Sequence, residues 1–272
     1  MNRQKSASDW ANLDRTADPA AFVGYLDVVT GQAAAQAYKQ ETYALLRLNP
    51  GDRVLDVGCG AGDDARALAQ LVAPTGQVIG VDASLTMVEE ARRRGDGLDL
   101  PLAYHTGDAH RLDFADGTCD GARADRVFQH LDDPERALAE LIRVTKPGGR
   151  IVVDDPDWGL LAVDAPDRDT TRTVLAEVAG AIRNPWMGRQ LFGLFRRAEL
   201  AEVTVVPATA VFTDYAQADR NFHLSDGLER ALVNGAVTAK AAESWTRGLE
   251  EATATGQFLC ALTAFIVAGQ RS

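Results

Sequence analysis

The sequence feature that most constrains the fold is a glycine-rich turn between an apolar segment and a helical one. The stretch VLDVGCGAGDD, residues 54–64, begins with strand-forming residues and places glycines at positions 58, 60 and 62. Glycines at such a turn let the backbone bend sharply and leave main-chain N–H groups at a helix N-terminus open to a ligand. The turn therefore predicts an α/β fold with its ligand site at the carboxyl end of a strand.

Strand-like and helix-like patterns alternate after this turn. Strands are predicted at residues 53–57, 78–81, 102–105, 122–124 and 151–153, and helices at 63–72, 84–94 and 134–144. Short connections between alternating elements imply a parallel sheet with helices on both faces. Further helices are predicted within 17–48 and at 170–182 and 189–199, and late strands at 203–212 and 258–267. The helical stretch 216–252 between these strands predicts a terminal antiparallel hairpin whose insertion covers the site.

Composition excludes several classes of partner. The chain has 28 basic against 39 acidic residues, a net charge of -11, which repels phosphate backbones and anionic headgroups. No apolar run approaches the roughly 18 residues that span a bilayer, and the N-terminus lacks the apolar middle of a signal peptide. We expect a soluble, cytoplasmic protein that binds no nucleic acid and does not insert into a membrane. Its three cysteines form no CxxC pair and its four histidines no HxxxH pair, so we expect neither disulfides nor a metal site.

The charge of the glycine turn discriminates between ligands. A nicotinamide-binding turn usually reads Gly-x-Gly-x-x-Gly, but Asp63 stands at the third glycine position here. Carboxylates at Asp56, Asp63 and Asp64 would oppose a pyrophosphate and favour a cation. S-adenosylmethionine, with its α-amino group and sulfonium centre, therefore fits this turn better than a dinucleotide.

Three more polar motifs follow predicted strands. Asp82 ends the second strand, where a carboxylate can accept hydrogen bonds from both ribose hydroxyls, and Ser84 can cap the next helix. Met87 could pack against an adenine. Asp108 follows the third strand and could accept the adenine amine, and residues 125–131 follow the fourth. All of these motifs are expected at one edge of the sheet, because parallel strands end there together.

In this order and spacing the motifs resemble those of class I S-adenosylmethionine-dependent methyltransferases. The matching segments are VLDVGCGAGDD, VIGVDAS, TGDAHRLDF, DRVFQHLDD and LIRVTKPGGRIVV. They are most similar to the branch with ubiquinone, menaquinone and many natural-product methyltransferases. The resemblance implies a Rossmann-like, seven-stranded, mostly parallel sheet with an antiparallel last strand. A single domain, 1–272, would divide into an N-terminal helical lid (1–49), a cofactor-binding half (50–155), and substrate-covering segments with terminal strands (156–272).

The resemblance also assigns cofactor-binding positions. They are Asp56, Gly58, Cys59, Gly60, Asp82, Ala83, Met87, Gly107, Asp108, Ala109 and Arg126. Asp56, Gly58 and Gly60 would cradle the methionine end, and Asp82 would bind the ribose. Arg126 falls where such enzymes use a main-chain carbonyl to hold the methionine amine. Many relatives have a small polar residue at that position, so its long side chain is a departure.

A catalytic pair is implied by similarity to phosphoethanolamine methyltransferases, in which a histidine works with an N-terminal tyrosine. His130 stands at the matching place, with Tyr25 as its first candidate partner and Tyr38 as its second. A histidine with a near-neutral pKa could deprotonate a nucleophile, as O-methylation requires. The residues expected to line the acceptor pocket are Phe22, Tyr25, Asp157, Trp158, Trp186, Arg189 and Phe222. Arg189 could pair with an acidic acceptor or with Asp157.

The predicted function is methyl transfer from S-adenosylmethionine to an oxygen or carbon atom of a small molecule, releasing S-adenosylhomocysteine. The acceptor would be a natural product of secondary metabolism, a phenol or a quinone-like compound. The signatures of amide and amine methylation, Asp/Asn-Pro-Pro-Tyr after the fourth strand, are absent. The alternatives are a non-methylating enzyme such as a cyclase that keeps the same cofactor, an NAD-dependent oxidoreductase, which Asp56 and Asp63 disfavour, and a pure binding module. The sequence does not specify an oligomeric state.

Overall fold

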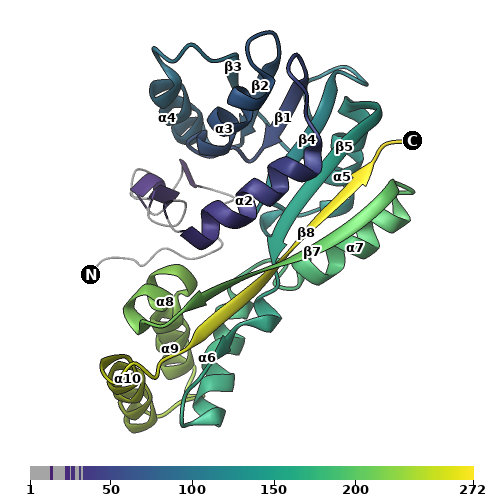
Figure 1. The fold of residues 1–272 in the computed structure, drawn as a ribbon. Helices are drawn as coiled ribbons and strands as arrows, with labels where there is room; N and C mark the ends of the chain where they lie inside the picture. Colours follow the sequence, from purple (N-terminus) through teal and green to yellow (C-terminus); the bar gives the residue numbers. More distant parts are fainter. Residues whose placement is uncertain (1–12, 15–21, 25, 28–30, 32) are drawn as a thin grey trace.

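A central sheet of eight strands runs through the part of the chain that the computed structural model describes, residues 13–14, 22–24, 26–27, 31 and 33–272 (Figure 1). Its strands are β1 (Arg53–Val57), β2 (Gln77–Asp82), β3 (Leu102–Thr106), β4 (Cys119–Asp125), β5 (Thr145–Pro156), β6 (Ala162–Val163), β7 (Ala201–Phe212) and β8 (Cys260–Gln270). The α-helices are α2 (Ala33–Leu46), α3 (Asp63–Val72), α4 (Leu85–Gly95), α5 (Pro134–Val144), α6 (Arg168–Gly180), α7 (Met187–Arg197), α8 (Tyr215–Phe222), α9 (Leu224–Val233) and α10 (Ala239–Ala254).

The sheet has the predicted mostly parallel topology. Its order is β3-β2-β1-β4-β5-β8, with β7 and the two-residue β6 also paired to β8. β8 is antiparallel to β5, β6 and β7, whereas β1 to β5 pair in parallel, so the predicted antiparallel last strand is confirmed. The sequence predicted seven strands and did not predict the two-residue β6. The chain order reverses between β1 and β4, and in open α/β sheets ligands bind at this reversal.

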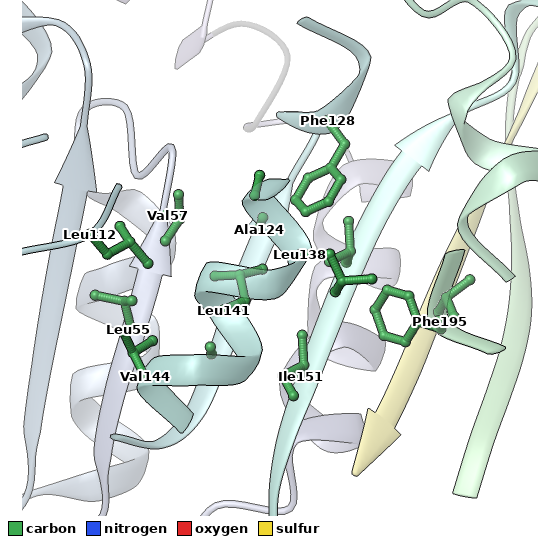
Figure 2. Packing of buried hydrophobic residues seen from close by; sticks show 14 of the residues in the cluster. Leu55, Val57, Leu112, Ala124, Phe128, Leu138, Leu141, Val144, Ile151 and Phe195 are labelled. Carbon is green, nitrogen blue, oxygen red and sulfur yellow. The ribbon is translucent and has the colours of Figure 1, made fainter. Parts of the chain in front are cut away.

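Helices cover both faces of the sheet, as the alternation predicts. On one face, α5 packs Leu138, Leu141 and Val144 against Leu55 of β1 and Ile151 of β5 (Figure 2). These apolar positions recur three and four residues apart, which gives α5 one buried stripe. On the other face, α2, α3 and α4 build a separate buried cluster with the same strands. Buried leucines of this kind each stabilise a fold by about 2–5 kcal/mol relative to alanine.

Apart from these two clusters, a further hydrophobic core lies at the far end of the β7–β8 ribbon, below the sheet in Figure 1. There α6, α8, α9 and α10 pack around Val174, Leu249 and Trp245, and the Trp245 Nε1 donates a 2.9 Å hydrogen bond to Thr171 Oγ1. This group of helices, α6 and α8–α10, is called the lid below; it is distinct from the N-terminal segment 1–49, which was expected from the sequence to form a helical lid. The predicted helical insertion between two antiparallel late strands is confirmed. Among the described residues, no helix combines the length and apolar character needed to cross a membrane.

Candidate active site

One large cavity, of about 810 Å³, lies at the carboxyl ends of the parallel strands. The glycine turn, the end of β2, residues 107–110 after β3 and most of residues 125–132 after β4 all line it. The four polar motifs predicted from the sequence therefore meet at one site. The cavity continues over β7 and β8 towards the lid.

The glycine turn depends on backbone that other residues rarely adopt. Gly58 and Gly60 have φ angles of +72° and +51°, in the left-handed region. A Cβ atom at Gly58 would stand 2.2 Å from Cγ2 of Val127, so the turn packs directly against the segment after β4. Larger side chains here would both strain the backbone and move the two motifs apart.

Two main-chain hydrogen bonds hold the Asp82 carboxylate between the glycine turn and the start of α4. Its Oδ2 accepts a hydrogen bond from Gly60 N and its Oδ1 one from Ser84 N, both at 2.9 Å. Burial raises the pKa of Asp82, although these main-chain donors oppose the shift. Ser84 caps α4 by accepting from Met87 N, as predicted. Each carboxylate oxygen keeps a second lone pair, so Asp82 can still accept from a ribose diol.

The site's adenine end is expected next to Asp108. Its Oδ1 accepts from His110 N at 2.9 Å and contacts His110 Nδ1 at 2.7 Å. Burial alone would raise the pKa of Asp108, but these contacts lower it. Ala109 and the buried Met87 also line the cavity.

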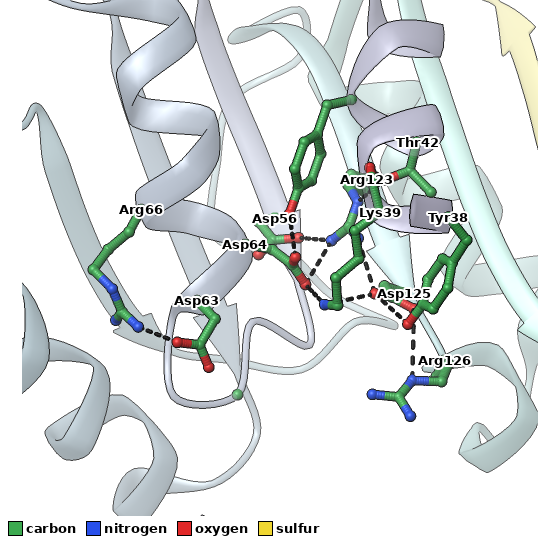
Figure 3. Close-up of polar contacts among 12 residues, drawn as sticks. Tyr38, Lys39, Thr42, Asp56, Asp63, Asp64, Arg66, Arg123, Asp125 and Arg126 are labelled. Carbon is green, nitrogen blue, oxygen red and sulfur yellow. Dashed lines mark hydrogen bonds and ion pairs between the residues drawn. The ribbon is translucent and has the colours of Figure 1, made fainter. Parts of the chain in front are cut away.

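Asp56 faces a buried charge network instead of the cavity (Figure 3). Arg123 of β4, 1% exposed, donates to Asp56 at 3.0 Å and to Asp125 at 2.9 Å, and lies 3.2 Å from Asp64. Lys39 of α2 donates to Asp64 at 2.5 Å and to Asp125 at 3.1 Å. Burial raises the pKa of Asp56 to about 7 even beside the guanidinium. The sequence did not identify either cation, because most of their partners, such as Asp56 for Arg123 and Asp125 for Lys39, are distant in the sequence.

Asp154, at the end of β5, is the second group that the sequence did not single out. It is 1% exposed and lines the cavity, and in the described part of the chain no donor reaches either of its carboxyl oxygens. Burial, together with the charge of Asp125, raises its pKa well above the usual range. Tyr38 of α2 also lines the cavity here and donates to both Asp125 oxygens at 3.4 Å (Figure 3).

His130, the histidine expected to act in catalysis, lines the same cavity. Burial, with the positive charges of Arg126 and Arg183, lowers the pKa of His130 to about 4, so its imidazole is neutral at physiological pH. Arg126 adopts a left-handed φ of +57°, and its main-chain N donates to Asp154 O at 2.7 Å. Tyr25, the predicted partner of His130, lies outside the described residues.

The predicted acceptor pocket divides into two groups. Phe22, Trp158 and Phe222 line the cavity. The other described members, Asp157, Trp186 and Arg189, are not in the lining: Arg189 pairs with Asp157 through both carboxylate oxygens, and Trp186 is 54% exposed. The structure thus shows the Asp157 pairing that was one of two alternatives for Arg189.

Comparison with known proteins agrees with this geometry. Residues 55–153 match a family model described as a methyltransferase domain. An uncharacterised 37.1 kDa protein of a Streptomyces fradiae transposon is 43% identical over 249 residues, which is 91% of this chain and 71% of that protein. A demethylmenaquinone methyltransferase from Symbiobacterium thermophilum is 40% identical over 43% of this chain and 47% of its own length. The crystal structure of Bacillus subtilis YcgJ, 21% identical, superposes with a TM-score of 0.60 over 87% of this chain and 99% of that one.

The fold is that of an α/β protein whose large cavity lies at the carboxyl ends of its parallel strands, the place where ligands bind in open α/β sheets. The chain belongs to the class I S-adenosylmethionine-dependent methyltransferases. Its cofactor is S-adenosylmethionine, and the residues present suit that molecule. The turn with positive-φ glycines admits close approach of the cofactor, and Asp82 keeps lone pairs for the ribose.

Proposed function

We propose that this enzyme transfers a methyl group to an oxygen or carbon atom of a largely apolar small molecule, such as a phenol, a quinol or a natural product of secondary metabolism. One observation carries the proposal: a single cavity joins the cofactor motifs to an apolar surface formed by Phe212, Leu262 and Phe222. A quinone-like acceptor is also supported by the name of the Symbiobacterium thermophilum relative.

The proposed roles follow from the placement of the residues. Main-chain groups at Gly58 and Gly60 would hold the methionine end, Asp82 the ribose and Asp108 the adenine amine. Asp56 would act indirectly, because it accepts a hydrogen bond from Arg123 and so helps to hold that side chain in place. The cofactor supplies an already activated methyl group, so the protein has mainly to align the acceptor and exclude water.

His130 would serve as a hydrogen-bond acceptor for the reacting group, with Tyr25 as its partner. A neutral imidazole can accept such a bond, and the low pKa of His130 keeps it neutral. The pairing with Tyr25 stays a prediction.

Cofactor binding is tested by calorimetric titration with S-adenosylhomocysteine. We expect the parent to bind it, and D82N to bind about 10-fold to 100-fold more weakly, because hydrogen bonds to charged groups contribute about 1.5–3 kcal/mol. The exposed D99N is the matched control and should bind like the parent. Equal affinity of D82N and the parent would contradict the proposed site.

Methyl transfer is tested with 1-naphthol and 1,4-naphthoquinol as acceptor probes. Incubation with S-adenosylmethionine should release S-adenosylhomocysteine and methylated product in equal amounts, both measured by chromatography. A product that forms without S-adenosylhomocysteine would favour a cofactor-assisted reaction such as cyclisation.

A further inference from the structure

Three small residues form a row across the cavity side of the sheet. Pro156 of β5 pairs with Ala264 of β8, and Ala264 pairs with Ala208 of β7. Directly paired residues in neighbouring strands point to the same face of a sheet, and all three line the cavity. They are called the small-residue row below.

The row lies between the two hydrophobic cores of that face. The next pair on the same face towards the cofactor motifs, Ile266 and Val206, lies two residues along each strand and packs into the cluster beneath α2. One step towards the lid, Leu262 and Ala210 pack into the lid core. The small side chains between them leave the sheet face open, and the cavity occupies this position.

A buried polar group lies beside the row, on its cofactor side. Asp154 stands two residues before Pro156 on β5, so it points to the same face and into the same cavity. Its carboxyl oxygens have no donor among the described residues although the side chain is 1% exposed. A protonated Asp154 can donate to the neighbouring Asp125 and still keeps acceptor lone pairs, so a ligand that brings a hydrogen-bond donor to the cofactor side of the row would contact it.

Aromatic side chains line the other end of the cavity. Trp158 and Phe222 meet edge to face with ring centroids 6.3 Å apart, and Phe222 and Phe212 meet at 5.2 Å. Trp158 is held in place because its Nε1 donates to Gln129 Oε1 at 2.7 Å. A sheet face of small side chains next to the edges of aromatic rings suits a planar apolar ring system.

We propose that the acceptor's ring system binds on the small-residue row of Pro156, Ala264 and Ala208, with its polar reacting group directed to Asp154 on the cofactor side of the row. This proposal rests on the proposed function and extends it, because it names the class of acceptor as fused aromatic molecules with one polar edge. Ala264, in the middle of the row, then sets the largest ring system that the enzyme accepts.

The test compares Ala264→Phe with Val211→Phe. Both changes enlarge a residue of the β7–β8 ribbon, but Val211 is 53% exposed and outside the cavity lining. The probes are phenol, 2-naphthol and 9-phenanthrol, and their affinities are measured by calorimetry in the presence of saturating S-adenosylhomocysteine. The parent should bind them with affinity rising with ring number, because each ring buries more apolar surface.

A264F should lose about 10-fold or more in affinity for 9-phenanthrol while its affinity for phenol changes less than about 2-fold, because the new ring overfills the row. V211F should bind all three like the parent. Ala264→Val, a smaller enlargement, should give an intermediate loss and serves as the test if A264F does not fold. Parent affinities that do not rise with ring number, or variants that affect all three probes alike, would overturn the proposed subsite.

Titration with S-adenosylhomocysteine separates the two proposals. The parent, A264F and V211F should bind it equally, since β4 and β5 lie between β8, which carries Ala264, and β1, which leads into the glycine turn. Failure of the parent to bind it would contradict the proposed function. Normal cofactor binding with unaltered 9-phenanthrol affinity in A264F would overturn the subsite alone.

Discussion

Asp154 combines burial with a lack of donors in the described part of the chain. The charged groups that act on it are Asp125, Arg126 and Arg123, and burial with the Asp125 charge outweighs the two guanidinium groups. The raised pKa means that the folded protein keeps a proton on Asp154 at pH values where the unfolded chain has lost it. Its contribution to stability is therefore fully present below the unfolded pKa and is lost as pH rises towards the folded pKa.

Asp154→Asn should consequently raise the melting temperature, and by more at pH 8 than at pH 5. The amide has nearly the shape of the protonated acid but carries no ionisation cost. A gain of 1 kcal/mol corresponds to about 2–4 °C in a chain of this size. Differential scanning calorimetry at the two pH values measures the effect, with the exposed D169N as control. A gain that does not grow with pH would show that Asp154 is ionised in the folded protein.

The contrast between Asp82 and Asp154 shows what the sequence can reveal about a single residue. Asp82 follows an apolar strand and precedes a capping serine, so neighbouring residues alone predicted its place, and Ser84 caps α4 as expected. Asp154 also follows a predicted strand, in the run Asp154-Asp155-Pro156-Asp157. Its neighbour Asp155 accepts a main-chain hydrogen bond from Phe128, which is distant in the sequence, and Asp157 accepts one from the nearby Gly159, whereas no main-chain donor reaches Asp154 among the described residues.

At the scale of elements, α2 is held over the cofactor end of the sheet by the charge network. The sequence predicted helices within residues 17–48, and α2 confirms a helix in that range. It did not predict that Lys39 and Thr42 would contact Asp125 and Arg123. Residues 81 and 86 positions apart meet there, and no local pattern encodes such a pairing.

Arg123→Met should destabilise the protein by about 3–5 kcal/mol, because it leaves Asp56 buried without its cation and Asp125 without one of its partners, although Lys39 still contacts Asp125. Urea unfolding followed by circular dichroism measures the change. The double variant D56N/R123M should recover part of the loss, since it removes one of the stranded charges. Arg47→Met, which breaks the exposed pair with Glu202, should cost at most about 1 kcal/mol. A loss in R123M no larger than that in R47M would show that the network does not hold α2.

At the scale of the whole molecule, the described residues form the central sheet with its helices and the lid, which are joined by β7 and β8, and the cavity is lined by residues of both (Figure 1). The order of strands and helices was predictable because each element has its own apolar period. The position of the cavity over the small-residue row was not, because it depends on the register of β5, β8 and β7. Since the two cores share few elements, we expect them to open independently.

Hydrogen exchange with mass spectrometry tests this independence. Leu249→Ala removes a fully buried side chain of the lid and should raise exchange in α6, α9 and α10, with a local cost of about 2–5 kcal/mol. Leu138→Ala, in α5, is the matched variant and should raise exchange in β1, β4 and β5. S-adenosylhomocysteine at 100 times its Kd should stabilise the cofactor-binding sheet by about 2.7 kcal/mol in the parent and in L249A alike. If L249A instead weakens cofactor binding and raises exchange across the sheet, the lid and the sheet unfold as one unit, and acceptor and cofactor binding are coupled through the common core.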